Sequence, residues 1–207
     1  GIRDSVAPRG LVDVHKRQDH STTMTEAAGD CGAYHGRGGD LIYRWGNPLT
    51  TKSGSLDDAT IYWQHDTGWI TDGLPGEGNI LVYNNGTNRN LDGDFEMLGM
   101  DFENSYSDLL EIRFPDRATG RYDTRRKPEI VWSWNADASE DYFSPFMSGW
   151  DRLPNGNTIF VSAYNKRVIE ITPAGERVLD YKIPGNGRMY RVYKYPRDYP
   201  GLGELFP

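Results

Sequence analysis

The sequence predicts an all-β fold built from repeated, four-stranded antiparallel units. Short runs of alternating apolar residues recur through the 207 residues between Gly, Pro, Asn and Asp, and little of the chain has helical periodicity. A Leu-Pro turn followed by Gly-Asn and an apolar strand occurs twice, at residues 74–83 and 153–161. Each copy precedes a Glu-Ile pair, a turn that contains Pro, and a strand that ends in an aromatic residue.

The closing strands end at Trp45, Trp134 and Tyr181, which we expect at equivalent positions of successive units. Three closing strands imply about two and a half units. The predicted organisation is an unplaced segment at 1–18, a blade end at 19–48, blades at 61–134 and 143–184, and a closing segment at 185–207. Four-stranded units of this length are typical of β-propeller blades. The alternative is a small β-sandwich whose hairpins are similar by accident.

Propellers generally have four to eight blades, so two and a half blades leave open sheet edges with unpaired backbone groups. The repeat count therefore predicts that further polypeptide closes the propeller. Either an N-terminal portion or a partner subunit could supply it.

Composition and the absence of several motifs exclude other classes of protein. The formal net charge is −7 and the basic residues are mostly scattered, which argues against nucleic acid as a partner. No apolar run approaches the roughly 18 to 20 residues that span a bilayer. A phosphate-binding Gly-rich loop, a G-x-S-x-G elbow and Cys-His zinc spacing are all missing, and no cofactor is expected.

His65 and Arg89 are the candidate catalytic residues. His65, in "YWQHD", is predicted to begin the innermost strand of its unit, where an imidazole faces the propeller channel. Arg89 follows the "VYNNG" turn, and a guanidinium suits a tetrahedral oxyanion such as sulfate. The alternatives are a hydrogen-bonded structural histidine and a solvated loop arginine.

A polar stretch after Arg89 carries acidic residues at alternate positions: Asp92, Asp94 and Glu96. Their carboxylates could supply oxygen ligands to Ca²⁺, although the twelve-residue spacing of known calcium loops is missing. A solvated acidic loop is the favoured interpretation.

Four motifs together resemble the bacterial arylsulfotransferase family, the arylsulfate sulfotransferase-like β-propellers, and they occur in the family's order from about 19 to 202. The motifs are "DHSTTMTEAAGD...GRGGDLIYRWGNP", "QHDTGWI...GLPGEGNILVYNNG", "FSPFMSGWDRLPNGNTIF" and "RVIEITPAGERVLDY". The resemblance implies a six-bladed propeller that transfers a sulfuryl group from a phenolic sulfate ester to another phenol without a nucleotide donor. It further implies that His65 contacts the sulfuryl group, that Arg89 clamps it, and that the protein is periplasmic or extracellular.

One part of the family pattern is missing. The resemblance implies a sulfuryl-accepting histidine near the start of a later blade, but "SPFMSGWDRLP" has Ser148 and Gly149 there. Three hypotheses remain: the nucleophile comes from further polypeptide, His65 takes the role, or the activity is lost or changed. The rival function is accordingly a non-catalytic propeller that serves as a binding or structural scaffold.

Overall fold

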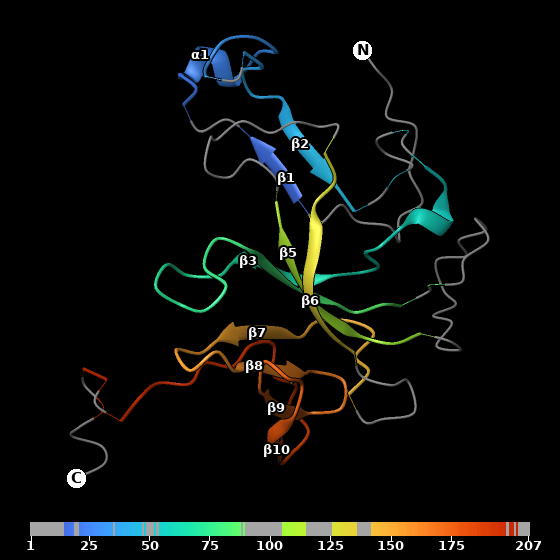
Figure 1. Ribbon diagram of the computed structural model, residues 1–207, viewed down its shortest axis with the longest axis vertical. Coiled ribbons are helices and arrows are strands. Elements are labelled where there is room, and N and C mark those ends of the chain that lie inside the picture. Colours follow the sequence, from blue (N-terminus) through green and yellow to red (C-terminus); the bar gives the residue numbers. More distant parts are fainter. Residues whose placement is uncertain are drawn as a thin grey trace.

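The computed structural model describes residues 15–18, 21–34, 36–46, 48, 52, 54–87, 89, 105–114, 126–135, 142–197, 199–200 and 202. The regular secondary structure of this part of the chain is almost entirely β-strand, as predicted (Figure 1). The strands are β1 His15–Gln18, β2 Leu41–Trp45, β3 His65–Trp69, β4 Ile80–Asn84, β5 Asp108–Arg113, β6 Glu129–Asn135, β7 Gly149–Arg152, β8 Thr158–Ser162, β9 Arg167–Ile171 and β10 Arg177–Lys182. The helical elements are one turn of α-helix, α1 Met24–Ala27, and a 3₁₀ turn, η1 Leu56–Asp58.

The strands form two four-stranded antiparallel sheets and one two-stranded pair. Strands β3 to β6 pair in sequence order, and strands β7 to β10 do the same. Strand β1 pairs with β2, so residues 15–18, which the sequence left unplaced, belong to the first layer of β-structure. The β1–β2 pair, the β3–β6 sheet and the β7–β10 sheet follow one another along the long axis of the molecule (Figure 1).

The hairpins between the first two strands of each sheet have the same turn chemistry. Gly78 and Gly156 each precede an Asn and have φ values of 77° and 87°. Glycine adopts this left-handed conformation without the steric cost of a Cβ atom. The Gly-Asn pair recurs because both turns need a residue with positive φ at this position. As a result, β4 and β8 begin at equivalent positions, directly after the asparagine.

Strand register shows that the two sheets are copies of one unit. The paired triplets are Tyr83, Leu109 and Trp134 in the first sheet and Val161, Val168 and Tyr181 in the second. Tyr83 and Val161 both lie four residues after the Gly-Asn asparagine, so Trp134 and Tyr181 occupy equivalent positions, as predicted. Trp45 ends β2 opposite His15 of β1, and its equivalence stays a prediction.

Apolar clusters fill the spaces between the layers. The cluster between the β1–β2 pair and the first sheet contains Tyr43, Ile61, Ile80, Val82, Leu110, Ile112 and Phe114. The cluster between the two sheets contains Tyr83, Leu109, Tyr142, Phe160, Ile169 and Ile171. On the outer face of the second sheet, Ile183, Met189 and Val192 from the segment after β10 pack over Leu153, Ile159, Val161 and Val168. All residues of β4 and β8 are buried because both faces of these strands are covered.

A buried carboxylate joins the first sheet to the second. Glu111 of β5 accepts a hydrogen bond from Asn79 Nδ2 at 2.6 Å and forms an ion pair with Arg152 of β7 at 2.7 Å. The Glu111 and Arg152 side chains are each 8% exposed. Arg152 also donates to the Pro75 carbonyl at 3.1 Å, which ties β7 to the β3–β4 hairpin.

The second sheet repeats this arrangement with a different cation. Glu170 of β9 is opposite Ile159, as Glu111 is opposite Leu81, so the two glutamates are equivalent. Glu170 accepts from Asn157 Nδ2 at 2.8 Å and from Lys194 Nζ at 2.6 Å. Lys194 thus pairs with Glu170 as Arg152 pairs with Glu111. The segment that contains Lys194 therefore lies against the second sheet where β7 lies against the first.

Asp66 of β3 connects the first strands of the two sheets, β3 and β7. Its Oδ2 accepts from the Trp150 backbone N–H of β7 at 3.0 Å, and its backbone carbonyl accepts from the Trp150 indole. Its Oδ1 forms an ion pair with Arg191. Strands β3, β7 and the C-terminal segment therefore meet at one carboxylate.

Among the described residues, no helix has both the length and the apolar character that a membrane crossing requires.

Candidate functional site

His65 is the first residue of β3, as the sequence predicts, and both of its ring nitrogens have partners. Nδ1 lies 2.7 Å from Asn85 Oδ1 and 3.1 Å from the Trp63 carbonyl oxygen. Nε2 accepts a hydrogen bond from the Met147 backbone N–H at 3.3 Å. The imidazole therefore lies at the junction between β3, the end of β4 and the segment that precedes β7.

The segment that precedes β7 has unusual backbone geometry beside His65. Met147 and Ser148 have φ values of 58° and 80°, and Trp63, two residues before His65, has a φ of 55°. Residues with a Cβ atom adopt such angles at a cost of about 1–2 kcal/mol each. Hydrogen bonds hold this segment in place, since Ser148 Oγ accepts from the Ala163 N–H at 3.1 Å.

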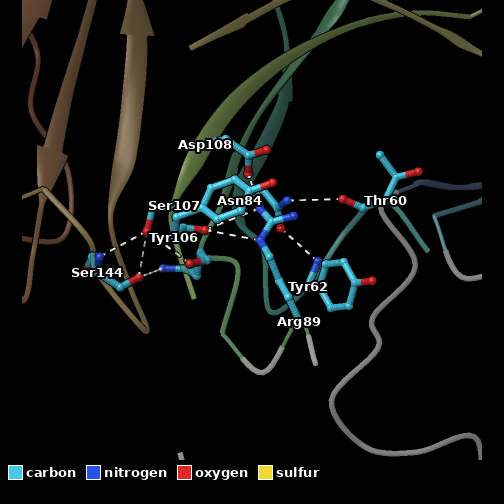
Figure 2. A network of polar contacts seen from close by, with 9 residues as sticks. Thr60, Tyr62, Asn84, Arg89, Tyr106, Ser107, Asp108 and Ser144 are labelled. Carbon is cyan, nitrogen blue, oxygen red and sulfur yellow. Dashed lines mark hydrogen bonds and ion pairs between the residues drawn. The ribbon is translucent and has the colours of Figure 1, made fainter. Parts of the chain in front are cut away.

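Two consecutive asparagines, Asn84 and Asn85, lie at the end of β4 and form hydrogen bonds within the site. Both are fully buried. Asn84 accepts from the Tyr62 N–H at 2.7 Å and donates to the Thr60 carbonyl at 3.2 Å, as Figure 2 shows. Asn85 Nδ2 donates to the Ser144 carbonyl at 2.7 Å and to the Met147 carbonyl at 3.0 Å.

Ser107 continues this network toward β5. Its hydroxyl donates to the Asn85 carbonyl at 3.0 Å and accepts from the Ser144 N–H at 3.0 Å (Figure 2). The neighbouring Thr87 donates to the Pro145 carbonyl at 2.8 Å. The segment 144–148 is therefore held by side chains of the first sheet, although it leads into the second.

Arg89 lies on the other side of Ser107, in an aromatic and acidic environment. Its Nη2 forms an ion pair with Asp108 Oδ1 at 2.7 Å, and its Nε and Nη2 donate to the Tyr106 carbonyl at 3.3 Å (Figure 2). The guanidinium carbon is 3.8 Å from the centre of the Tyr106 ring and 5.2 Å from that of Tyr62. The hydrogen bonds of Arg89 to described residues are made by Nε and Nη2.

Burial raises the pKa of Asp108 from about 3.8 to about 6, although Arg89 and a hydrogen bond with Asn84 favour the charged form. Removing water from the carboxylate thus outweighs the attraction of the guanidinium. The carboxyl is neutral in both the folded and the unfolded chain below pH 4, and charged in both above pH 6. Between these limits the folded chain alone keeps the proton, so the stability from this group falls as pH rises.

Asp108→Asn should remove this pH dependence. Relative to the wild type, the variant's free energy of unfolding in urea should rise by about 3 kcal/mol from pH 4 to pH 7, because two pKa units correspond to that energy. Asp58→Asn is the control of opposite sign, since hydrogen bonds from the Ser55 backbone and side chain lower the pKa of Asp58. Asp58 contributes stability that is lost as pH falls below about 4. A profile for Asp108→Asn that runs parallel to the wild type would contradict the assignment.

The structure places the predicted site residues on two sides of one network. His65 contacts Asn85 and Met147, Arg89 contacts Tyr106 and Asp108, and no direct contact joins the two side chains in the described structure. That they bind the same tetrahedral anion stays a prediction. Gly149 pairs with Val161 as His65 pairs with Tyr83, so the second unit has glycine at the position of His65.

The proposed calcium ligands Asp92, Asp94 and Glu96 lie outside the described residues. The described residues contain no cluster of three or more metal-ligating side chains.

Sequence reasoning did not foresee the hydrogen bonds that join Asn85 and Ser107 to the segment 144–148. The "NNG" stretch suggested only a turn, and Ser107 is a small polar residue before a strand. A signal did exist for Asn85: it is the second of two asparagines at the end of a buried strand, where a buried amide needs partners.

Comparisons with protein-family models, curated proteins and solved structures found no match to this chain.

Proposed function

We propose that the two sheets are successive blades of a β-propeller, which further polypeptide completes. Val82 and Leu110 face the β1–β2 layer, and their equivalents Phe160 and Ile169 face the first sheet. Each sheet thus turns the same face toward the preceding layer. A two-layer sandwich covers one face of each sheet, whereas β4 and β8 are buried on both faces.

We propose that the site transfers a sulfuryl group from an aryl sulfate to a phenolic acceptor, with His65 as the group that carries it. The observation behind this proposal is the orientation of His65 at the start of β3. Its Nδ1 faces two carbonyl oxygens, which leaves the lone pair on Nε2. A neutral imidazole with a lone pair in a fixed direction is a suitable nucleophile.

The reaction balances in two steps. The Nε2 lone pair forms a bond to sulfur while the bond from sulfur to the phenolic oxygen breaks, and its electron pair leaves with the phenolate. The acceptor oxygen then forms a bond to sulfur, the nitrogen–sulfur bond breaks and its pair returns to Nε2, and the acceptor proton passes to solvent. Arg89 offsets the negative charge on the sulfuryl oxygens.

The contact between the Met147 N–H and Nε2 must open for this attack. At 3.3 Å it is longer than the usual 2.9–3.0 Å. A hydrogen bond of this kind contributes about 0.5–1.5 kcal/mol net, so its loss slows the reaction by about tenfold at most. The released N–H is then available to a sulfuryl oxygen.

His65→Ala should abolish release of phenol from a chromogenic aryl sulfate in the presence of a phenolic acceptor. Arg89→Ala should lower kcat by about 100-fold, because it removes charge stabilisation of a few kcal/mol. Arg113→Ala is the matched control, since the ion pair between Arg113 and Glu129 is 59% and 67% exposed. Mass spectrometry after rapid acid quench should find one sulfuryl group on His65 in the wild type.

A non-catalytic scaffold is the second candidate. It is favoured by the engagement of His65 Nε2 by Met147 and of Arg89 by Asp108. Folded wild-type protein that forms no sulfuryl adduct and releases no phenol with any phenolic acceptor would establish this alternative over the enzyme.

A further inference from the structure

The side-chain amide of Asn85 is buried, and its hydrogen-bond partners determine which way its oxygen and its nitrogen point. Its amide contacts two backbone carbonyls, of Ser144 at 2.7 Å and of Met147 at 3.0 Å, and one ring nitrogen of His65 at 2.7 Å. Carbonyl oxygens only accept hydrogen bonds, so the NH₂ group must face both of them. The amide oxygen is thereby directed at His65 Nδ1.

An acceptor directed at Nδ1 requires that this nitrogen carry the proton. The Trp63 carbonyl, 3.1 Å from Nδ1, is a second acceptor and imposes the same requirement. On the opposite side of the ring, the Met147 N–H is a donor 3.3 Å from Nε2, which requires a lone pair there. Three separate partners thus select one tautomer of the neutral imidazole.

We propose that Asn85 is a positioning residue for sulfuryl transfer: it holds His65 as the Nδ1–H tautomer and so keeps the Nε2 lone pair available to sulfur. This inference rests on the proposed function for its catalytic consequence. When Nε2 bonds to sulfur, the ring becomes cationic, and the hydrogen bond from Nδ1–H to the amide oxygen becomes charge-assisted and stronger.

Comparison with the second sheet indicates that Asn85 serves His65 and not the fold of the sheet. Ala163 follows β8 as Asn85 follows β4, and Gly149 stands where His65 stands. The buried amide and the imidazole are present together in one unit and missing together in the other. A general requirement of the blade fold would place an amide in both.

Nitrogen-15 NMR of the imidazole tests the tautomer without any substrate. With the His65 signals assigned by their loss in His65→Gln, the wild type should show a protonated Nδ1 and an unprotonated Nε2 at neutral pH. Asn85→Ala should show a mixture of tautomers. Asn84→Ala is the matched control, because Asn84 is equally buried but bonds to Tyr62 and Thr60, and it should keep the wild-type pattern.

Kinetics supply the second readout. Asn85→Ala should lower kcat on the order of 100-fold with little change in KM, and Asn85→Asp, which keeps an acceptor toward Nδ1, should recover part of the loss. A wild-type His65 protonated on Nε2, or a folded Asn85→Ala with wild-type tautomer and kcat, would overturn the inference. If the Asn85 variants do not fold, the wild-type spectrum decides. An Nδ1–H wild-type His65 in a protein without sulfuryl transfer would instead refute the proposed function.

Discussion

Glu111→Leu is expected to lower the free energy of unfolding by about 3–5 kcal/mol, the usual result of removing one partner from a buried ion pair. The substitution leaves the Arg152 guanidinium 8% exposed without its carboxylate and removes the acceptor of Asn79. Desolvation of the unpaired charge dominates the loss. Urea unfolding followed by far-ultraviolet circular dichroism measures it.

Two further variants test whether the loss of stability comes from the unpaired charge of Arg152 or from the change in packing. Glu170→Leu is the matched control: its partner Lys194 is 54% exposed and becomes solvated, so the loss should be about 1 kcal/mol. The double variant Glu111→Leu, Arg152→Met should recover most of the stability, because apolar replacement of a whole buried pair is often neutral. Equal losses at Glu111 and Glu170, or a double variant less stable than Glu111→Leu, would contradict this interpretation.

Phe160→Ala is expected to cost about 3–5 kcal/mol of unfolding free energy, since the ring fills the space between the two sheets. The side chain is fully buried, and its ring centre lies 5.0 Å from that of Trp134 and 6.2 Å from that of Tyr83. Removing the ring takes apolar contacts from both sheets at once and leaves a cavity between them.

Tyr181→Ala is the control for Phe160→Ala. Tyr181 occupies in the second sheet the position of Trp134 in the first, yet it is 53% exposed. Its loss should change the unfolding free energy by less than about 1 kcal/mol. Comparable losses for the two variants in urea unfolding would show that Phe160 does not join the sheets.

The repeat was predictable because it depends on local chemistry. Gly78 and Gly156 satisfy a backbone requirement at fixed distance from their strands, and alternation of apolar residues determines which face is buried. The equivalence of Trp134 and Tyr181 follows from these two features and needs no knowledge of long-range contacts. The start of β3 at His65 was also predicted.

The environment of the site was not predictable in this way. His65 meets Met147, which is 82 positions further along the chain, and no local pattern encodes that contact. Asn85 is important because of where the segment 144–148 passes, and the left-handed Met147 and Ser148 follow no glycine signal. The two glutamates are an intermediate case: the recurrent Glu-Ile pair indicated an equivalence, but not the cation that each would bind.

Arg152 and Lys194 should stabilise their two contacts against local unfolding to different extents. A guanidinium buried at 8% exposure also donates to the Pro75 carbonyl, whereas the Lys194 ammonium is a single charge that water reaches easily. We therefore expect the contact between the second sheet and the C-terminal segment to open at a lower free energy than the contact between the two sheets. Amide hydrogen exchange should therefore be faster in the C-terminal segment than around His65 and Asn85.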